Sequence, residues 1–122
     1  MAYQYEVHPA RRLVEIRFEG VLSPTDIAEL RAELLADEQF DPSFKQLIDG
    51  RHITQFENVG TRTMEEHASK RADVSVAGAR RAFVVTADLG YGLTRVFQAL
   101  ADSDDVQVFR DYDAAVLWLE GE

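Results

Sequence analysis

The clearest pattern of apolar and polar positions lies in the C-terminal half of the chain, where it predicts strand, helix, strand, helix. Residues 82–87 are apolar almost throughout, as in a strand that is covered on both faces of a parallel sheet. Residues 90–101 carry apolar side chains at helical spacing, and residues 106–109 form a last short strand. A closing helix follows, capped by Asp111 or Asp113 and packed on the sheet.

Alternation near the N-terminus predicts an antiparallel hairpin. Apolar and polar residues alternate over residues 3–8 and again over residues 13–19, and Gly20 ends the second run. Ser23 and Pro24 then mark a helix start, because serine caps a first turn and proline tolerates the first helical position. The stripe that must face the sheet consists of Ile27, Leu30, Leu34 and Leu35.

The middle of the chain carries a weaker pattern. Residues 44–49 predict a short strand that ends at Asp49 and Gly50, and residues 61–72 have the composition of a helix. The apolar face of that helix is thin and consists of Met64, Ala68 and Ala72. The order is therefore β-β-α-β-α-β-α-β-α in one domain over residues 1–122. We expect an α/β fold with a mixed, mostly parallel sheet and an N-terminal antiparallel hairpin.

With these elements the chain resembles the SpoIIAA-like family of small bacterial proteins, which is related to the STAS anti-sigma-factor antagonists. The resemblance covers nearly the whole chain and implies a single SpoIIAA/STAS-like sandwich. It implies no one activity, because such proteins are mostly uncharacterised and function does not follow from fold. The residues that carry it are FKQLID (44–49), GARRAFV (78–84), YGL (91–93), FQAL (97–100), VFRD (108–111), AA (114–115) and WL (118–119).

In the antagonists, a serine at the start of the helix after the third strand is phosphorylated and switches partner binding. The corresponding residues 57–61 contain no serine, so the chain departs here from the pattern of the antagonists. Thr61 and Thr63 are the nearby hydroxyls, and a phosphate there would meet the positive end of a helix. Phosphorylation of Thr61 or Thr63 stays open.

Composition narrows the classes of function. The 122 residues carry a net charge of −9 and no cysteine, which excludes disulfides and thiolate catalysis and opposes binding to nucleic acid. No apolar run approaches the ~20 residues of a membrane span, and no secretory signal is present, so we expect a cytoplasmic protein. The three histidines lie in different elements, and no serine lies in a sequence motif typical of a catalytic nucleophile. We therefore expect no metal, no cofactor and no enzymatic activity.

Ligands in open α/β sheets bind beyond the carboxyl ends of the strands. The predicted ligand site combines charged groups, an aromatic ring and two glycines: Asp49, Arg51, Asp88, Gly90, Tyr91, Gly92 and Arg95. We expect a small anion at this helix N-terminus, where glycine lets the backbone approach a ligand closely. In the alternative interpretation no ligand binds, Asp88 caps the helix and Arg95 pairs with Asp88 or Asp49.

The sequence favours a non-enzymatic binding or regulatory module that acts through protein contacts. The alternative is a carrier of a small apolar or anionic ligand, held in the strand-end crevice or beneath the helix over residues 61–72. A helix with little to bury either packs loosely over a cavity or moves, although a marginal surface helix is the simpler interpretation. Similar folds of the CRAL-TRIO lipid-transfer group open such a helix to admit an acyl chain. A homodimer through the exposed hairpin edge stays open.

Overall fold

The computed structural model describes residues 2–70, 73–76, 78–101 and 104–121. Within these residues five strands form one sheet, in the order of the chain: β1 (Tyr3–His8), β2 (Leu13–Leu22), β3 (Lys45–Phe56), β4 (Arg81–Val84) and β5 (Val106–Phe109). The first two strands are antiparallel, and the other neighbouring pairs are parallel. The expected element order and the N-terminal hairpin are therefore confirmed.

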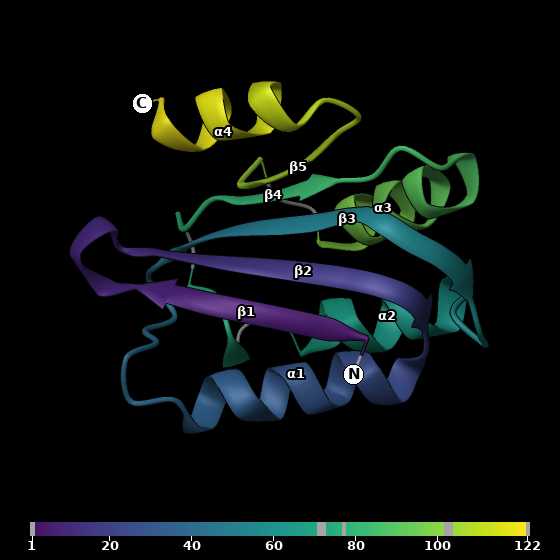
Figure 1. Cartoon of the computed structure of the whole chain (residues 1–122), viewed down its shortest axis with the longest axis horizontal. Coiled ribbons are helices and arrows are strands. Elements are labelled where there is room, and N and C mark those ends of the chain that lie inside the picture. Colours follow the sequence, from purple (N-terminus) through teal and green to yellow (C-terminus); the bar gives the residue numbers. More distant parts are fainter. Residues whose placement is uncertain (1, 71–72, 77, 102–103, 122) are drawn as a thin grey trace.

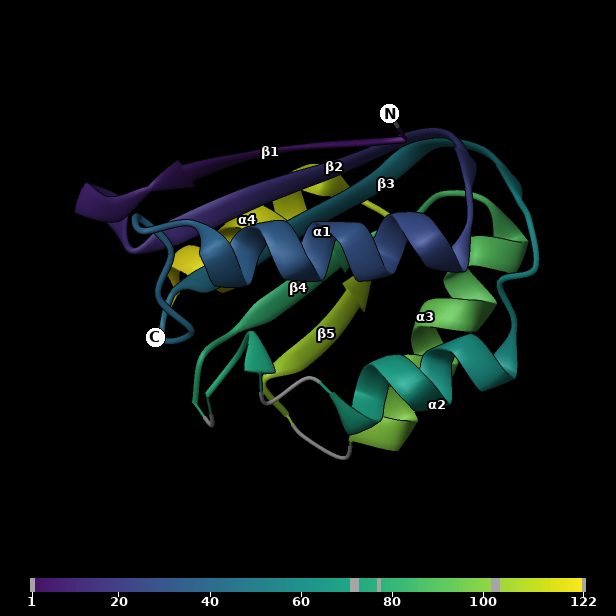
Figure 2. The ribbon, with the colours of Figure 1, turned by 90° about the horizontal axis from the view of Figure 1, so that it is seen from below.

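Helices cover both faces of the sheet (Figure 1). They are α1 (Pro24–Ala36), α2 (Thr61–Ser69), α3 (Asp88–Ala101) and α4 (Tyr112–Glu120), and a short 3-10 turn, η1 (Pro9–Arg11), joins β1 to β2. Figure 2 shows α1, α2 and α3 in front of the sheet and α4 behind it. Right-handed crossovers between successive parallel strands place each crossover helix on the same face, whereas α4 follows the last strand and is free to cover the other.

Local capping begins two of the helices as expected. The Ser23 hydroxyl accepts a hydrogen bond from the backbone N–H of Asp26, and the Asp26 carboxylate accepts one from the N–H of Ser23. Pro24 occupies the first helical position. At α4, the cap is Asp111, whose carboxylate accepts from the N–H of Ala114.

The strands alternate between two hydrophobic cores. The larger core lies beneath α1, α2 and α3 and includes Ile48, whereas the smaller core lies beneath α4 and includes Leu47. Both side chains are buried. Adjacent residues of β3 therefore serve opposite faces, which follows from the two-residue period of a strand.

The predicted ends of the second and third strands were wrong. Asp49 and Gly50 do not end β3, which continues to Phe56 because its second half pairs with the extended end of β2. Gly20 does not end β2 either. Gly20 lies where the register between the two strands shifts, and its φ is +69°. Glycine adopts this conformation without strain.

The bounds of three other elements also differ from the prediction. Strand β4 covers residues 81–84 rather than 82–87, and α3 begins at Asp88 rather than at residue 90. Helix α2 ends at Ser69, and Ala72, expected on its apolar face, lies outside the described residues. Met64 is the buried residue of α2, so the thin apolar face expected of this helix is present.

Candidate ligand-binding site

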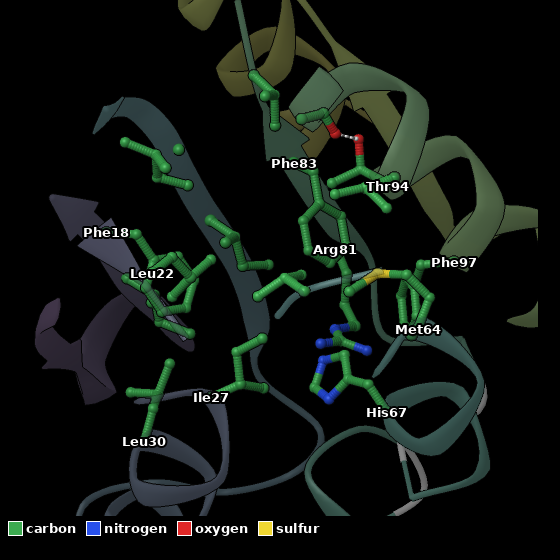
Figure 3. Close-up of a pocket in the computed structure, with 18 of the residues that line it drawn as sticks. Phe18, Leu22, Ile27, Leu30, Met64, His67, Arg81, Phe83, Thr94 and Phe97 are labelled. Carbon is green, nitrogen blue, oxygen red and sulfur yellow. Dashed lines mark hydrogen bonds between the residues drawn. The ribbon is translucent and has the colours of Figure 1, made fainter. Parts of the chain in front are cut away.

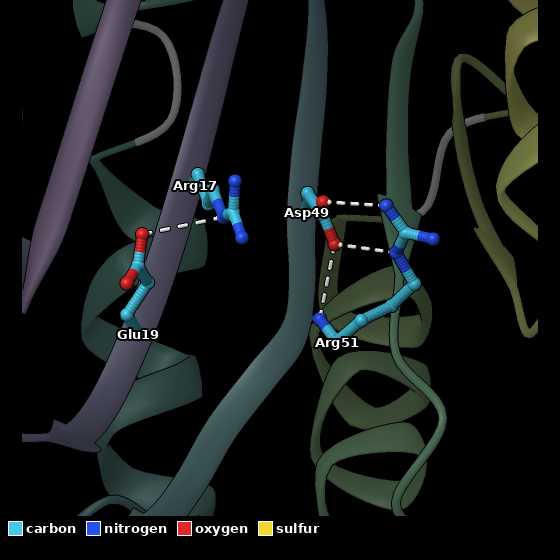
Figure 4. Close-up of polar contacts among 4 residues, drawn as sticks. All are labelled: Arg17, Glu19, Asp49 and Arg51. Atoms are coloured by element: carbon cyan, nitrogen blue, oxygen red, sulfur yellow. Dashed lines mark hydrogen bonds and ion pairs between the residues drawn. The ribbon is translucent and has the colours of Figure 1, made fainter.

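Asp49 and Arg51, two members of the predicted site, form an ion pair on the α4 side of the sheet (Figure 4). The guanidinium donates from Nε and Nη2 to the two carboxylate oxygens, each at 3.0 Å, and the backbone N–H of Arg51 donates to Oδ1. The same guanidinium lies 4.4 Å from the ring centroid of Tyr112 in α4. Burial alone would raise the pKa of Asp49, but the hydrogen bonds from Arg51 outweigh it, and the pKa lies below its ordinary value.

Asp88 and Tyr91, two further members, contact Arg110 instead. Arg110 Nη2 lies 3.0 Å from Asp88 Oδ1, and the guanidinium lies 4.2 Å from the ring centroid of Tyr91. Asp88 is the first residue of α3 and is almost fully exposed. Arg95 is exposed, and within the described part of the chain it pairs with neither Asp88 nor Asp49. The pairing of Arg95 expected in the alternative interpretation was therefore wrong.

Asp49 and Arg51 border one cavity, and Gly90 borders another. The cavity beside Asp49 and Arg51 is bounded by β1, β2, β3 and Tyr112. Gly90 instead lines a cavity on the opposite face, beneath α1, α2 and α3. Gly92 is exposed with open space around it. The tertiary structure thus separates residues that the strand-end rule brought together, and binding of a small anion by the whole set stays a prediction.

The cavity that Gly90 lines is apolar and measures about 90 Å³. Helices α1, α2 and α3 form its outer wall, and strands β2, β3 and β4 form its inner wall (Figure 3). Its apolar lining includes Ile27, Leu30, Ile48, Met64, Phe83 and Phe97. Protein interiors are packed about as densely as organic crystals, so a space of this size beneath three helices is a candidate ligand site.

Polar groups enter this cavity from neighbouring strands. Gln46 of β3 and Arg81 of β4 are partners in the parallel register, and both are buried at 1% and 4% exposure. Gln46 Nε2 donates to the carbonyl of Val74 at 2.7 Å, and its Oε1 accepts from Arg81 Nε at 3.2 Å. The guanidinium of Arg81 also lies 5.3 Å from the ring centroid of Phe97. Gln46 therefore fixes the orientation of a cationic group inside an apolar cavity.

His67 of α2 points toward Arg81 at the same place (Figure 3). Its ring lies 5.0 Å from that of Phe97, and its Nδ1 atom is buried without a hydrogen-bond partner among the described residues. Burial, followed by the charges of Arg81 and Arg31, lowers the pKa of His67 to about 3. The imidazole is therefore neutral at physiological pH.

Sequence reasoning missed Gln46 and Arg81, although a signal for them was present. The alternation that faces Ile48 toward the larger core also faces Gln46 there, and it places Arg81 on the same side as Phe83. A polar residue at a core-facing position is informative because such residues are seldom buried without a reason. His67 carried no such signal, because its position depends on how α2 packs.

The two threonines considered for phosphorylation lie at the start of α2. Thr61 is the first helical residue and is exposed. The Thr63 hydroxyl accepts from the N–H of Gly60 and donates to the carbonyl of Asn58, both at 3.3 Å, so it caps the helix. Phosphorylation of either residue stays a prediction.

The described residues contain no group of three or more His, Asp and Glu side chains that could hold a metal ion. None of their helices combines the length and the apolar character that a membrane crossing requires.

Comparison with known proteins identifies a structural relative. No protein-family model matches the chain, and no curated protein matches it. Among solved structures, an uncharacterised protein of the DUF3478 family from Shewanella loihica PV-4, with a SpoIIAA-like fold, superposes with a TM-score of 0.63. The match covers 97% of this chain and 94% of that chain at 17% sequence identity, a level that establishes the fold alone. The chain therefore has a SpoIIAA-like fold, as its resemblance to that family predicted.

Proposed function

We propose that this chain is a binding protein for a small, largely apolar ligand, which occupies the cavity beneath α1, α2 and α3. The observation that carries the proposal is the cavity of about 90 Å³ that Met64 and His67 of α2 border together with the sheet. Leaving such a space empty costs roughly 2 kcal/mol of stability, because the lining atoms lose their packing partners. A ligand of matching shape recovers that loss and binds the folded state alone.

The packing of α2 supports this proposal. The helix contacts α3 extensively, whereas its contacts with the strands are sparse (Figure 2). Its buried residue is Met64, which lines the cavity. An element with few buried apolar contacts opens at lower free energy than the core around it. Helix α2 is therefore the natural route by which a ligand enters.

The regulatory module predicted from the sequence remains the second candidate. Its support is the set of large apolar side chains left exposed, which come from several separate segments: Val21, Leu35, Val76, Leu89, Leu100 and Leu117. Single exposed apolar residues are common on monomeric proteins, so the set favours partner binding less than the cavity favours a ligand.

Native mass spectrometry tests the proposal. Protein purified without detergent or organic solvent, from the cells that naturally make it, is expected to carry a noncovalent mass that denaturation releases. A wild-type chain at its bare mass would contradict the proposal. The measurement also counts subunits and so tests the homodimer.

A matched pair of variants locates the bound mass. Ile48→Phe places a larger ring on the cavity side of β3, and Leu47→Phe makes a comparable change on the α4 side of the same strand. Both overpack a core and are expected to cost about 1–3 kcal/mol, which urea unfolding measures. Only Ile48→Phe should lose the bound mass. Equal retention by both variants would place the ligand elsewhere.

A further inference from the structure

We infer that the ligand of this cavity carries an anionic head group, a carboxylate in its simplest form, which lies against Arg81 and His67. The inference rests on the proposed function and adds the chemical class of the ligand. It concerns the charge, the hydrogen bonds and the size of the cavity beneath α1, α2 and α3.

The charge of the cavity is opposite to that of the chain. The whole sequence contains 22 acidic residues and carries a net charge of −9. Among the described residues that line the cavity, two are arginines, Arg31 of α1 and Arg81 of β4, and none is acidic. A positive group in a low-dielectric cavity attracts an anion far more strongly than one in water does. Arg31 and Arg81 therefore favour an anionic over a neutral head group at that place.

The guanidinium of Arg81 is held in a fixed orientation. Gln46 is anchored by its bond to Val74, and its other amide atom accepts from Arg81 Nε. The rings of Phe83 and Phe97 lie 5.5 Å and 5.3 Å from the guanidinium carbon. A guanidinium offers several N–H donors in a planar fork that matches a carboxylate, so a ligand can bind beside its other acceptors.

His67 supplies a second point of recognition. Its buried Nδ1 has no hydrogen-bond partner among the residues that the structure describes, and a buried polar atom without a partner costs free energy. In the tautomer protonated at Nδ1, the neutral imidazole donates one hydrogen bond to a carboxylate oxygen. Arg81 and His67 come from β4 and α2, so a head group bound to both also ties α2 to the sheet.

The size of the cavity limits the rest of the ligand. A volume of about 90 Å³ is smaller than the cavities of roughly 150 Å³ that admit benzene. The lining beyond Arg81 and His67 is aliphatic and aromatic. A short-chain carboxylic acid with fewer heavy atoms than benzene, such as propanoate, fits both properties.

The test compares an acid with its neutral isostere. Wild-type protein is titrated at pH 7 with propanoate and with propanamide, and binding is followed by calorimetry and by methyl NMR. The acid is expected to bind about tenfold more tightly or better, since a charge-assisted hydrogen bond is stronger than a neutral one. Arg81→Met should remove this preference and leave the affinity for the amide in place.

Arg80→Met is the matched control. Arg80 is the neighbour of Arg81 in sequence, but its guanidinium donates to the carbonyls of Trp118 and Gly121 on the α4 side. The control should keep the preference for the acid. If Arg81→Met does not fold, Arg31→Met serves as the second variant and should reduce the preference for the acid.

Each outcome decides between the two proposals. Equal affinity for acid and amide in the wild type would overturn the inference and leave the proposed function standing. The inference would also fail if folded Arg81→Met kept the preference. Absence of binding by both compounds, together with a bare mass in native mass spectrometry, would overturn the proposed function itself.

Discussion

The ring of Phe56 packs directly against the backbone of Gly90, where any side chain would collide with it. A Cβ atom at Gly90 would lie 2.9 Å from Phe56 Cζ and 2.5 Å from Val85 Cγ1. Both Phe56 and Gly90 line the apolar cavity. The absence of a side chain at residue 90 thus allows β3 and the first turn of α3 to meet beside the cavity.

We predict opposite effects for alanine at the two glycines of α3. Gly90→Ala should destabilise the fold by about 1–3 kcal/mol, because the added methyl group overpacks Phe56 and Val85. Gly92→Ala meets nothing within 4 Å and should stabilise by up to about 1 kcal/mol through helix propensity. Urea unfolding of both variants measures the difference. Similar stability for the two would show that Phe56 and Val85 yield freely.

His67 should make the fold less stable as the pH falls. Its pKa is lowered to about 3 in the folded protein by burial and by the charges of Arg81 and Arg31, whereas unfolded histidine titrates near 6.5. Between these values the unfolded state binds one more proton. The contribution of the neutral His67 imidazole to the free energy of unfolding is therefore complete above about pH 6.5. It is lost progressively toward pH 3, by about 1.4 kcal/mol per pH unit.

Comparison of wild type with His67→Phe isolates this contribution. In urea unfolding from pH 7 to pH 4.5, the variant should lose less stability than the wild type as the pH falls. The slope of its unfolding free energy against pH should correspond to one fewer proton taken up on unfolding. The carboxylates titrate in both proteins and cancel in the difference. If the imidazole of His67 titrates near pH 6.5 in NMR spectra of the folded protein, the prediction is contradicted.

The ion pair of Asp49 with Arg51 should contribute more to stability than that of Glu19 with Arg17, the two pairs drawn in Figure 4. The carboxylate of Asp49 is 11% exposed and accepts three hydrogen bonds, whereas that of Glu19 is 43% exposed. Asp49→Asn is expected to cost about 1–2 kcal/mol, and Glu19→Gln less than about 0.5 kcal/mol.

The pH dependence of the Asp49 effect has a definite sign. Because the pKa of Asp49 is lowered in the folded state, its contribution is present above the unfolded pKa of about 3.9 and is lost as the pH falls through the folded pKa. The difference between wild type and Asp49→Asn should stay constant from pH 5 to pH 8 and shrink below about pH 4. Equal costs for the two variants at pH 7 would contradict the comparison.

Local pattern was sufficient for the elements whose boundaries depend on neighbouring residues. The capping box of Ser23 and Asp26 begins α1 because both partners lie within one turn. Leu47 and Ile48 alternate between the two cores because adjacent strand residues face opposite sides. The fold class followed from the order of these elements.

The ends of the strands needed information from outside each segment. The extension of β3 to Phe56 exists because β2 continues beside it, and the register shifts around Gly20 belong to that pairing. The predicted ligand residues also separated for this reason. Asp49 and Arg51 lie on the face of the sheet that α4 covers, whereas Gly90 lines the cavity on the opposite face, beneath α1, α2 and α3.

The sequence by itself determined the order of strands and helices and the apolar face of most of them. Only the tertiary structure decided that Arg81 and His67 meet beside one cavity, since they belong to β4 and α2 and no short-range pattern links them. The physical reason is that periodicity specifies a face, whereas a cavity depends on how closely the faces of separate elements pack. The distance between α2 and the sheet is set by side chains from the whole layer, and it is there that this chain leaves space.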